Sequence, residues 1–125
     1  MTLGETIELH IYRFVEQGGK GQRRSVLFPQ LTQLVLGATN VDVIDALVRL
    51  HDRGFIKLER FERNAMNYVS YAAFGGRGNF FNDLGGDFGI TLTPQGRLDI
   101  EHREQALAVA PSNSCLLYTS DAADE

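Results

Sequence analysis

The residues that could bind a metal ion or carry out catalysis are dispersed along the 125-residue chain. His10, His51 and His102 fall in three different predicted helices, without the short spacing that lets two side chains share one metal ion. Asp83 and Asp87 are four residues apart and lack the alternating oxygen pattern of a calcium-binding loop. We find neither a serine–histidine–aspartate arrangement nor paired catalytic carboxylates. We therefore expect no enzymatic activity, no metal site and no cofactor.

Arginines offer the clearest binding chemistry, because guanidinium groups donate hydrogen bonds to the phosphates of nucleic acid. They are joined by two polar residues at the start of a predicted helix. The residues predicted to contact duplex DNA are Arg23, Arg24, Thr39, Asn40, Arg49, Arg60 and Arg77. Lys57 and Arg63 flank Arg60 in the same predicted strand. Helix capping is the competing interpretation for Thr39 and Asn40, and an ordinary solvated surface is the competing interpretation for the arginines.

The formal net charge of −4 depends strongly on the C-terminal residues. Residues 115–125 resemble the translation of a transposase-derived sequencing adaptor, and they hold three of the sixteen acidic residues and no basic one. The remaining 114 residues have thirteen acidic against twelve basic side chains, a net charge of −1 that permits DNA binding. We expect residues 111–125 to be a disordered tail and the natural C-terminus to be missing. Cys115 would then have no redox role.

The pattern of apolar residues predicts the elements that position these side chains. Pro29 suits the first turn of a helix, Thr39 or Asn40 suits an N-cap, and Gly54 suits a helix end. The expected helices are residues 3–17, 29–37, 40–53 and 93–109. The expected strands are residues 25–28, 55–61, 67–74 and 90–92. This mixture indicates an α+β domain over residues 1–110.

Two segments carry a resemblance to known regulators. Residues 47–56, LVRLHDRGFI, resemble the end of the recognition helix and the entry into the wing of MarR-like and PadR-like proteins. Residues 90–97, ITLTPQGR, resemble the segment that leaves the wing in the same families. Together with the order of the elements, the resemblance implies a winged helix-turn-helix fold. It consists of a three-helix core, a β-wing and a C-terminal helix.

The resemblance implies a cytoplasmic transcriptional regulator that binds duplex DNA as a homodimer, with residues 40–53 in the major groove. The first and last helices would form the dimer. The outward face of the third helix carries three aspartates, which oppose a phosphate backbone: Asp42, Asp45 and Asp52. Since no run of eighteen apolar residues occurs, we expect no membrane span.

The predicted wing departs from the compact hairpin of those families, because about 28 residues separate Phe61 from Ile90. This insertion is rich in glycine and phenylalanine. Its rings either fold the insertion back onto the sheet or form an exposed apolar surface for a partner. In the second case Phe80 and Phe81 would bind the partner, and the chain would be a winged-helix protein-interaction module without DNA binding.

Overall fold

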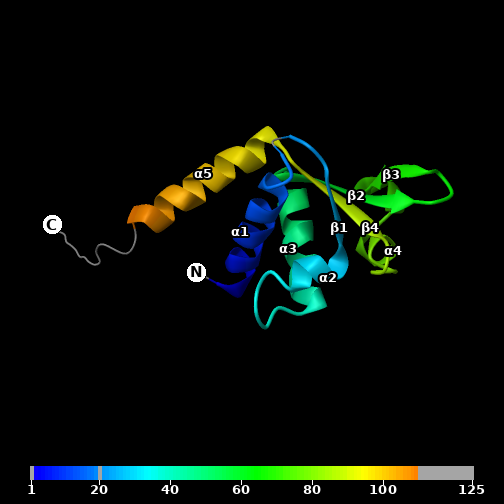
Figure 1. Ribbon diagram of the computed structural model, residues 1–125, viewed down its shortest axis with the longest axis horizontal. Coiled ribbons are helices and arrows are strands. Elements are labelled where there is room, and N and C mark those ends of the chain that lie inside the picture. The colour runs from blue at the N-terminus through cyan, green and yellow to red at the C-terminus, as the bar shows by residue number, and fades with distance from the viewer. Residues whose placement is uncertain (1, 20, 110–125) are drawn as a thin grey trace.

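The computed structural model describes residues 2–19 and 21–109, which form a mixed α+β arrangement (Figure 1). The predicted tail at residues 111–125 lies outside this part. The helices are α1 (Leu3–Glu16), α2 (Phe28–Thr32), α3 (Asn40–Asp52), α4 (Arg77–Phe80), α5 (Pro94–Val109) and the 3₁₀ turn η1 (Tyr71–Phe74). The strands are β1 (Arg24–Leu27), β2 (Ile56–Glu62), β3 (Asn67–Ser70) and β4 (Asp87–Leu92). They form one antiparallel sheet in the order β1-β4-β2-β3.

The sheet has one buried face and one open face. Val26, Leu58 and Ile90 are at most 2% exposed and point toward the helices. Their neighbours Ser25 and Glu59 share a row with Gly89 and point the other way. Figure 1 shows α1, α2, α3 and α4 on the buried side, and no helix in the described part of the chain covers the opposite face.

The third predicted helix agrees with the structure almost residue for residue. Thr39 is its N-cap: the Thr39 hydroxyl accepts from the Asp42 amide at 3.1 Å, and the Asp42 carboxylate accepts from the Thr39 amide at 2.9 Å. Gly54 follows the helix with a φ of 78°, a conformation that favours glycine. Thr39 thus has the capping role, and Asn40 is the first helical residue.

We expect Thr39→Ala to lower the free energy of unfolding by about 1 kcal/mol, because the Asp42 amide at the start of α3 loses its bond to the Thr39 hydroxyl. Urea denaturation followed by circular dichroism measures this. Asn40→Ala is the matched control and should change stability by less than half as much. Equal losses for the two variants would contradict the capping assignment.

The second predicted helix is shorter than expected: residues 29–37 were predicted, and α2 ends at Thr32. The Pro29 carbonyl accepts both the Thr32 hydroxyl at 3.0 Å and the Gln33 amide at 3.2 Å. The Leu34 amide then bonds the carbonyl only three residues back, which tightens the turn and ends the helix. Packing of the following apolar residues on the core replaces the last predicted turns.

The strand predicted at residues 67–74 is also shorter, since β3 ends at Ser70 and η1 follows. The Tyr71 ring packs 4.6 Å from the His51 ring and 5.0 Å from the Phe80 ring, measured between centres. These contacts draw the chain away from the sheet and toward α3. The closing strand was predicted at residues 90–92. In the structure this strand, β4, is longer and begins at Asp87.

The phenylalanines of the insertion fold it back onto the core. Phe80 and Phe88 are fully buried and Phe81 is 9% exposed, with ring centres 4.8–5.9 Å apart. The alternative in which Phe80 and Phe81 form an exposed docking surface is therefore wrong. Burial of large aromatic rings outweighs the conformational freedom of the surrounding glycines.

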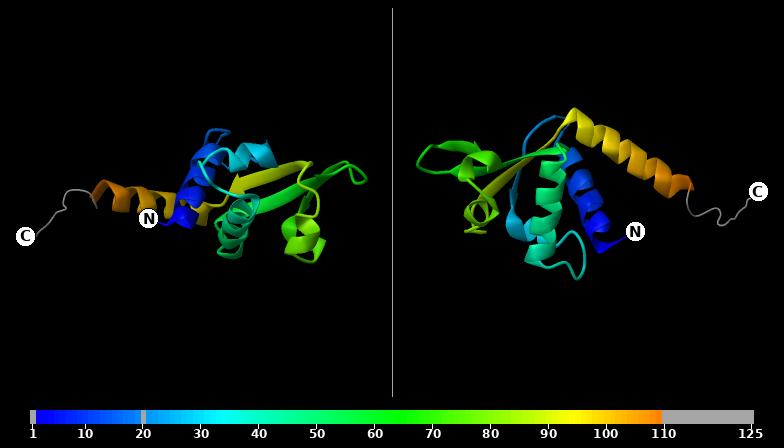
Figure 2. Two further views of the ribbon diagram at one scale, coloured as in Figure 1. Left: turned by 90° about the horizontal axis from the view of Figure 1, so that it is seen from below. Right: turned by 180° about the vertical axis from the view of Figure 1, so that it is seen from behind.

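The two segments that carried the family resemblance meet in space at the start of α5. The Thr93 hydroxyl donates to the Gly54 carbonyl at 2.6 Å, and the Thr93 amide donates to the Phe55 carbonyl at 3.1 Å. A Cβ on Gly96 would lie 2.0 Å from that same Phe55 oxygen, so only glycine fits there. Beyond this contact α5 extends away from the sheet (Figure 2). None of the helices in the described ranges is long and apolar enough to cross a bilayer.

Candidate nucleic-acid interface

Arg49, the basic residue that the sequence places on the outward face of α3, is held by α1. Its Nε donates to the Glu8 carboxylate at 2.7 Å, and the Glu8 side chain is only 3% exposed. Gly4 gives the Arg49 guanidinium room, because a Cβ there would lie 2.7 Å from Nη2. Arg49 therefore fixes α1 against α3 and has little freedom to reach a phosphate.

The insertion occupies the other flank of α3. The Arg77 guanidinium pairs with the Asp45 carboxylate, and Tyr71 packs on His51. Figures 1 and 2 place α4 beside α3 on the same side of the sheet. A helix with its side chains is about 10–12 Å wide, and the major groove of B-DNA is about 12 Å wide. The groove thus accommodates one helix, and the insertion is held against one flank of α3 by Arg77 and Tyr71.

Arg60 anchors the insertion. Its Nη1 donates to the Phe80 carbonyl at 2.9 Å and to the Asn82 side chain at 2.8 Å, and its Nε lies 3.4 Å from the Glu62 carboxylate. Only 13% of the Arg60 side chain is exposed, so its role is structural. Of the remaining predicted arginines, Arg24 lies over the Phe14 ring at 4.2 Å.

Arg23 lies on the open face of the sheet. Its guanidinium carbon is 4.2 Å from the centre of the Tyr68 ring, and its Nε donates to the Glu59 carboxylate at 2.9 Å. This hydrogen bond raises the pKa of Arg23. The Tyr68 hydroxyl of β3 bonds that of Ser25 on β1, across β2 and β4. Gly89 makes this arrangement possible, because a Cβ there would lie 2.7 Å from Arg23 Cδ and 3.0 Å from the Tyr68 ring.

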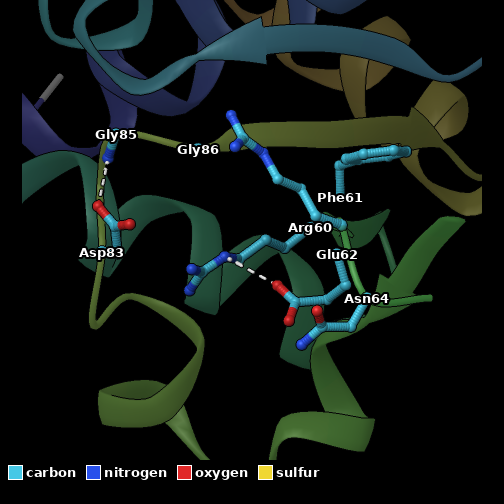
Figure 3. Close-up of a pocket in the computed structure, with 8 residues that line it drawn as sticks. Arg60, Phe61, Glu62, Asn64, Asp83, Gly85 and Gly86 are labelled. Carbon is cyan, nitrogen blue, oxygen red and sulfur yellow. Dashed lines mark hydrogen bonds and ion pairs between the residues drawn. The ribbon is translucent and has the colours of Figure 1, made fainter. Parts of the chain in front are cut away.

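Phe61 connects this open face to a cavity of about 450 Å³ between the β2–β3 hairpin and the insertion (Figure 3). The Phe61 and Tyr68 rings meet edge to face, with centres 5.4 Å apart and planes at 72°. The residues that line the cavity are Arg60, Phe61, Glu62, Arg63, Asn64, Asp83, Gly85 and Gly86. The structure thus joins an aromatic ring and two arginines at one place.

The carboxylates of this cavity already have partners. Figure 3 shows Glu62 directed toward Arg60 and the Asp83 carboxylate accepting from the Gly85 amide, at 2.9 Å. Arg63 is exposed and forms no ion pair with any residue in the described ranges. The cation that remains for a ligand is Arg63.

Of the seven predicted DNA contacts, the structure places only Arg23 on this open face. Thr39 and Asn40 begin α3, Arg49 and Arg77 form ion pairs beside it, and Arg24 and Arg60 pack on aromatic or insertion residues. Phe61 and Tyr68, whose rings meet on this face, were not among the predicted contacts. The two-residue spacing of Lys57, Glu59 and Phe61 places all three side chains on one face, and it is the signal that could have found Phe61.

Comparisons with protein-family models, curated proteins and solved structures give no match to this chain. Within residues 2–19 and 21–109, no group of three or more histidine, cysteine, aspartate or glutamate side chains is placed to hold a metal ion. The assignment of function therefore depends on the geometry of the surface.

Proposed function

We propose that this chain is a winged-helix protein that binds DNA through the open face of its sheet and the β2–β3 hairpin, with α3 in a structural role. The observation that carries the proposal is the position of Arg23 and Lys57 with two aromatic rings on the face that the described helices leave uncovered, and of the exposed Arg63 beside Phe61 in the adjoining hairpin. Arginine and lysine side chains on such a surface provide phosphate contacts.

The order of the elements supports the winged-helix part of the proposal. The succession α1-β1-α2-α3-β2, followed by a returning strand and a closing helix, is the order expected for that domain. Regulation of transcription, and a homodimer formed through α1 and α5, are the further roles that the resemblance implies. The chain departs from that domain at α3, the helix that would enter the major groove. Glu8 contacts one side of α3 and the insertion contacts the other.

Salt titration of duplex binding tests the proposal. We expect Arg23→Ala and Arg63→Ala each to weaken binding of a fluorescein-labelled 20-base-pair duplex and to reduce the slope of log K against log salt by about one. Fluorescence anisotropy between 25 and about 200 mM salt measures both quantities, a range over which phosphate contacts have a large effect.

The matched control is Arg53→Ala, which removes an exposed arginine at the C-terminal end of α3. We expect it to leave the affinity and the salt slope nearly unchanged. A large effect of Arg53→Ala with none for Arg23→Ala would show that α3 contacts the duplex and would contradict the proposed site. Absence of binding at 25 mM salt to both this duplex and its separated strands would contradict DNA binding as such.

A second candidate function is a protein-interaction module, and the exposed side of α3 favours it. This side carries the exposed Asp52 and the partly exposed Asp42 and Asp45, of which Asp45 is paired with Arg77, together with Val41, which is 58% exposed. Carboxylates around an exposed apolar residue oppose DNA and suit a basic protein partner. The salt titration separates the candidates, because this module would bind no duplex at any salt concentration.

A further inference from the structure

We propose that the open face of the sheet binds single-stranded nucleic acid, with Phe61 as the surface on which a base stacks and Arg63 and Lys57 as phosphate contacts. This inference rests on the proposed nucleic-acid function and narrows its ligand. Proteins that bind single strands combine basic side chains with aromatic rings on which unpaired bases stack. Both components occur together on this face.

Phe61 is placed to accept a base. Its ring meets Tyr68 edge to face, so Tyr68 covers at most one face of Phe61. The side chain is partly exposed and lines the cavity of about 450 Å³. This volume falls in the usual range of about 300–1,000 Å³ for sites that hold small organic ligands. A nucleobase on Phe61 would therefore have room for its sugar between the hairpin and the insertion.

The rigidity of the neighbouring groups supports a stacking site. Arg60 is fixed by the Phe80 carbonyl and the Asn82 side chain, which hold the insertion at the edge of the cavity. Tyr68 is fixed from above by Arg23 and at its hydroxyl by Ser25. A site whose walls are fixed before binding loses little conformational entropy when the ligand arrives.

The charges of the face agree with a polyanion. Its cations are Arg23, Lys57 and Arg63, and its carboxylates are Glu59 and Asp87. Glu59 is engaged by Arg23. Lys57 near the start of β2 and Arg63 just past its end form no ion pair within the described ranges, and neither does Asp87, so the cations exceed the carboxylates by one.

Stacking also decides between single-stranded and duplex ligands. In a duplex each base is stacked on its neighbours, so its face is closed to a side chain, whereas unpaired bases present that face. A contact through Phe61 is available to a single strand alone. Phosphate contacts through Arg63 are available to both forms.

The experiment measures fluorescence anisotropy of a labelled twelve-residue oligothymidylate and of a twelve-base-pair duplex, with unlabelled thymidine monophosphate as competitor. We expect the single strand to bind at least tenfold more tightly than the duplex. Phe61→Leu, which keeps an apolar side chain for the fold, should weaken single-strand binding about 5- to 100-fold and leave the duplex unchanged. Leu98→Ala, at an exposed leucine of α5, is the control and should change neither.

Several outcomes would overturn the inference. Equal affinity for the two polymers with no effect of Phe61→Leu would reject the stacking site and leave the proposed function standing, whereas no binding of either polymer would reject both. If thymidine monophosphate displaced the labelled single strand at a concentration equal to that of the oligonucleotide, the site would bind a mononucleotide and not a strand. Dissociation of a dimer by Phe61→Leu in sedimentation, with unchanged oligonucleotide binding, would show that this face binds a second copy.

Discussion

Phe80→Ala is expected to lower the free energy of unfolding by about 3–5 kcal/mol, the cost typical of removing a buried phenylalanine side chain. Phe80 is fully buried, and its ring centre lies 4.8–5.6 Å from those of Tyr71, Phe74, Phe81 and Phe88. Alanine would leave a cavity where the insertion joins the core. Chemical denaturation followed by circular dichroism measures the loss.

The matched control for Phe80→Ala is Leu36→Ala, at a leucine that is 100% exposed in the loop before α3. We expect this control to change the free energy of unfolding by less than about 0.5 kcal/mol. A loss below about 1 kcal/mol for Phe80→Ala would mean that the insertion is separable from the core. The insertion would then not hinder the approach of α3 to a major groove.

Elements marked by strong local signals were predictable from the sequence. The segment from Thr39 to Gly54 has a capping residue, a continuous apolar face and a glycine end, and the structure begins and ends α3 accordingly. The lengths of α2 and β3 were not predictable in this way. Each ends because of a contact that sequence spacing does not reveal: the shared Pro29 carbonyl in one case and the Tyr71 ring packing in the other.

The candidate site was less predictable, because the partners of the arginines are distant in sequence. Arg49 is 41 residues from Glu8, and Arg60 is 20 residues from the Phe80 carbonyl. A list of basic residues cannot separate those engaged within the fold from those left for a ligand. Because side chains alternate along β2, Phe61 and Arg60 point to opposite faces of the sheet. Which of the two faces stays open depends on where the helices pack.

Glu8→Ala is the second substitution with a large expected effect, because Glu8 is the carboxylate that joins three helices. It accepts from Arg49 of α3 at 2.7 Å and from Arg103 of α5 at 2.8 Å. Arg103 also pairs with Asp99 at 2.8 Å, and Asp99 accepts from the Tyr12 hydroxyl at 2.7 Å. Burial and then the bond to Asp99 raise the pKa of Tyr12, which keeps this hydroxyl a donor.

Removing one partner from a buried ion pair costs about 3–5 kcal/mol, because the remaining charge is left without compensation. The Arg49 side chain is 39% exposed and can be rehydrated, so we expect the lower end of that range, about 3 kcal/mol. Glu16→Ala is the control on the same helix; Glu16 forms no ion pair with a described residue and should matter little. A loss for Glu8→Ala no larger than that of the control would contradict the network.

A double-mutant cycle with Arg49→Ala isolates the α1–α3 contact within this network. Because the two side chains touch, we expect a coupling free energy of about 1–3 kcal/mol, with the double variant more stable than the sum of the single losses predicts. A coupling near zero would mean that Arg49 leaves Glu8 in solution and is available to phosphates. Strong coupling would mean instead that the fold already engages Arg49 through Glu8, which leaves this arginine little freedom to contact a phosphate.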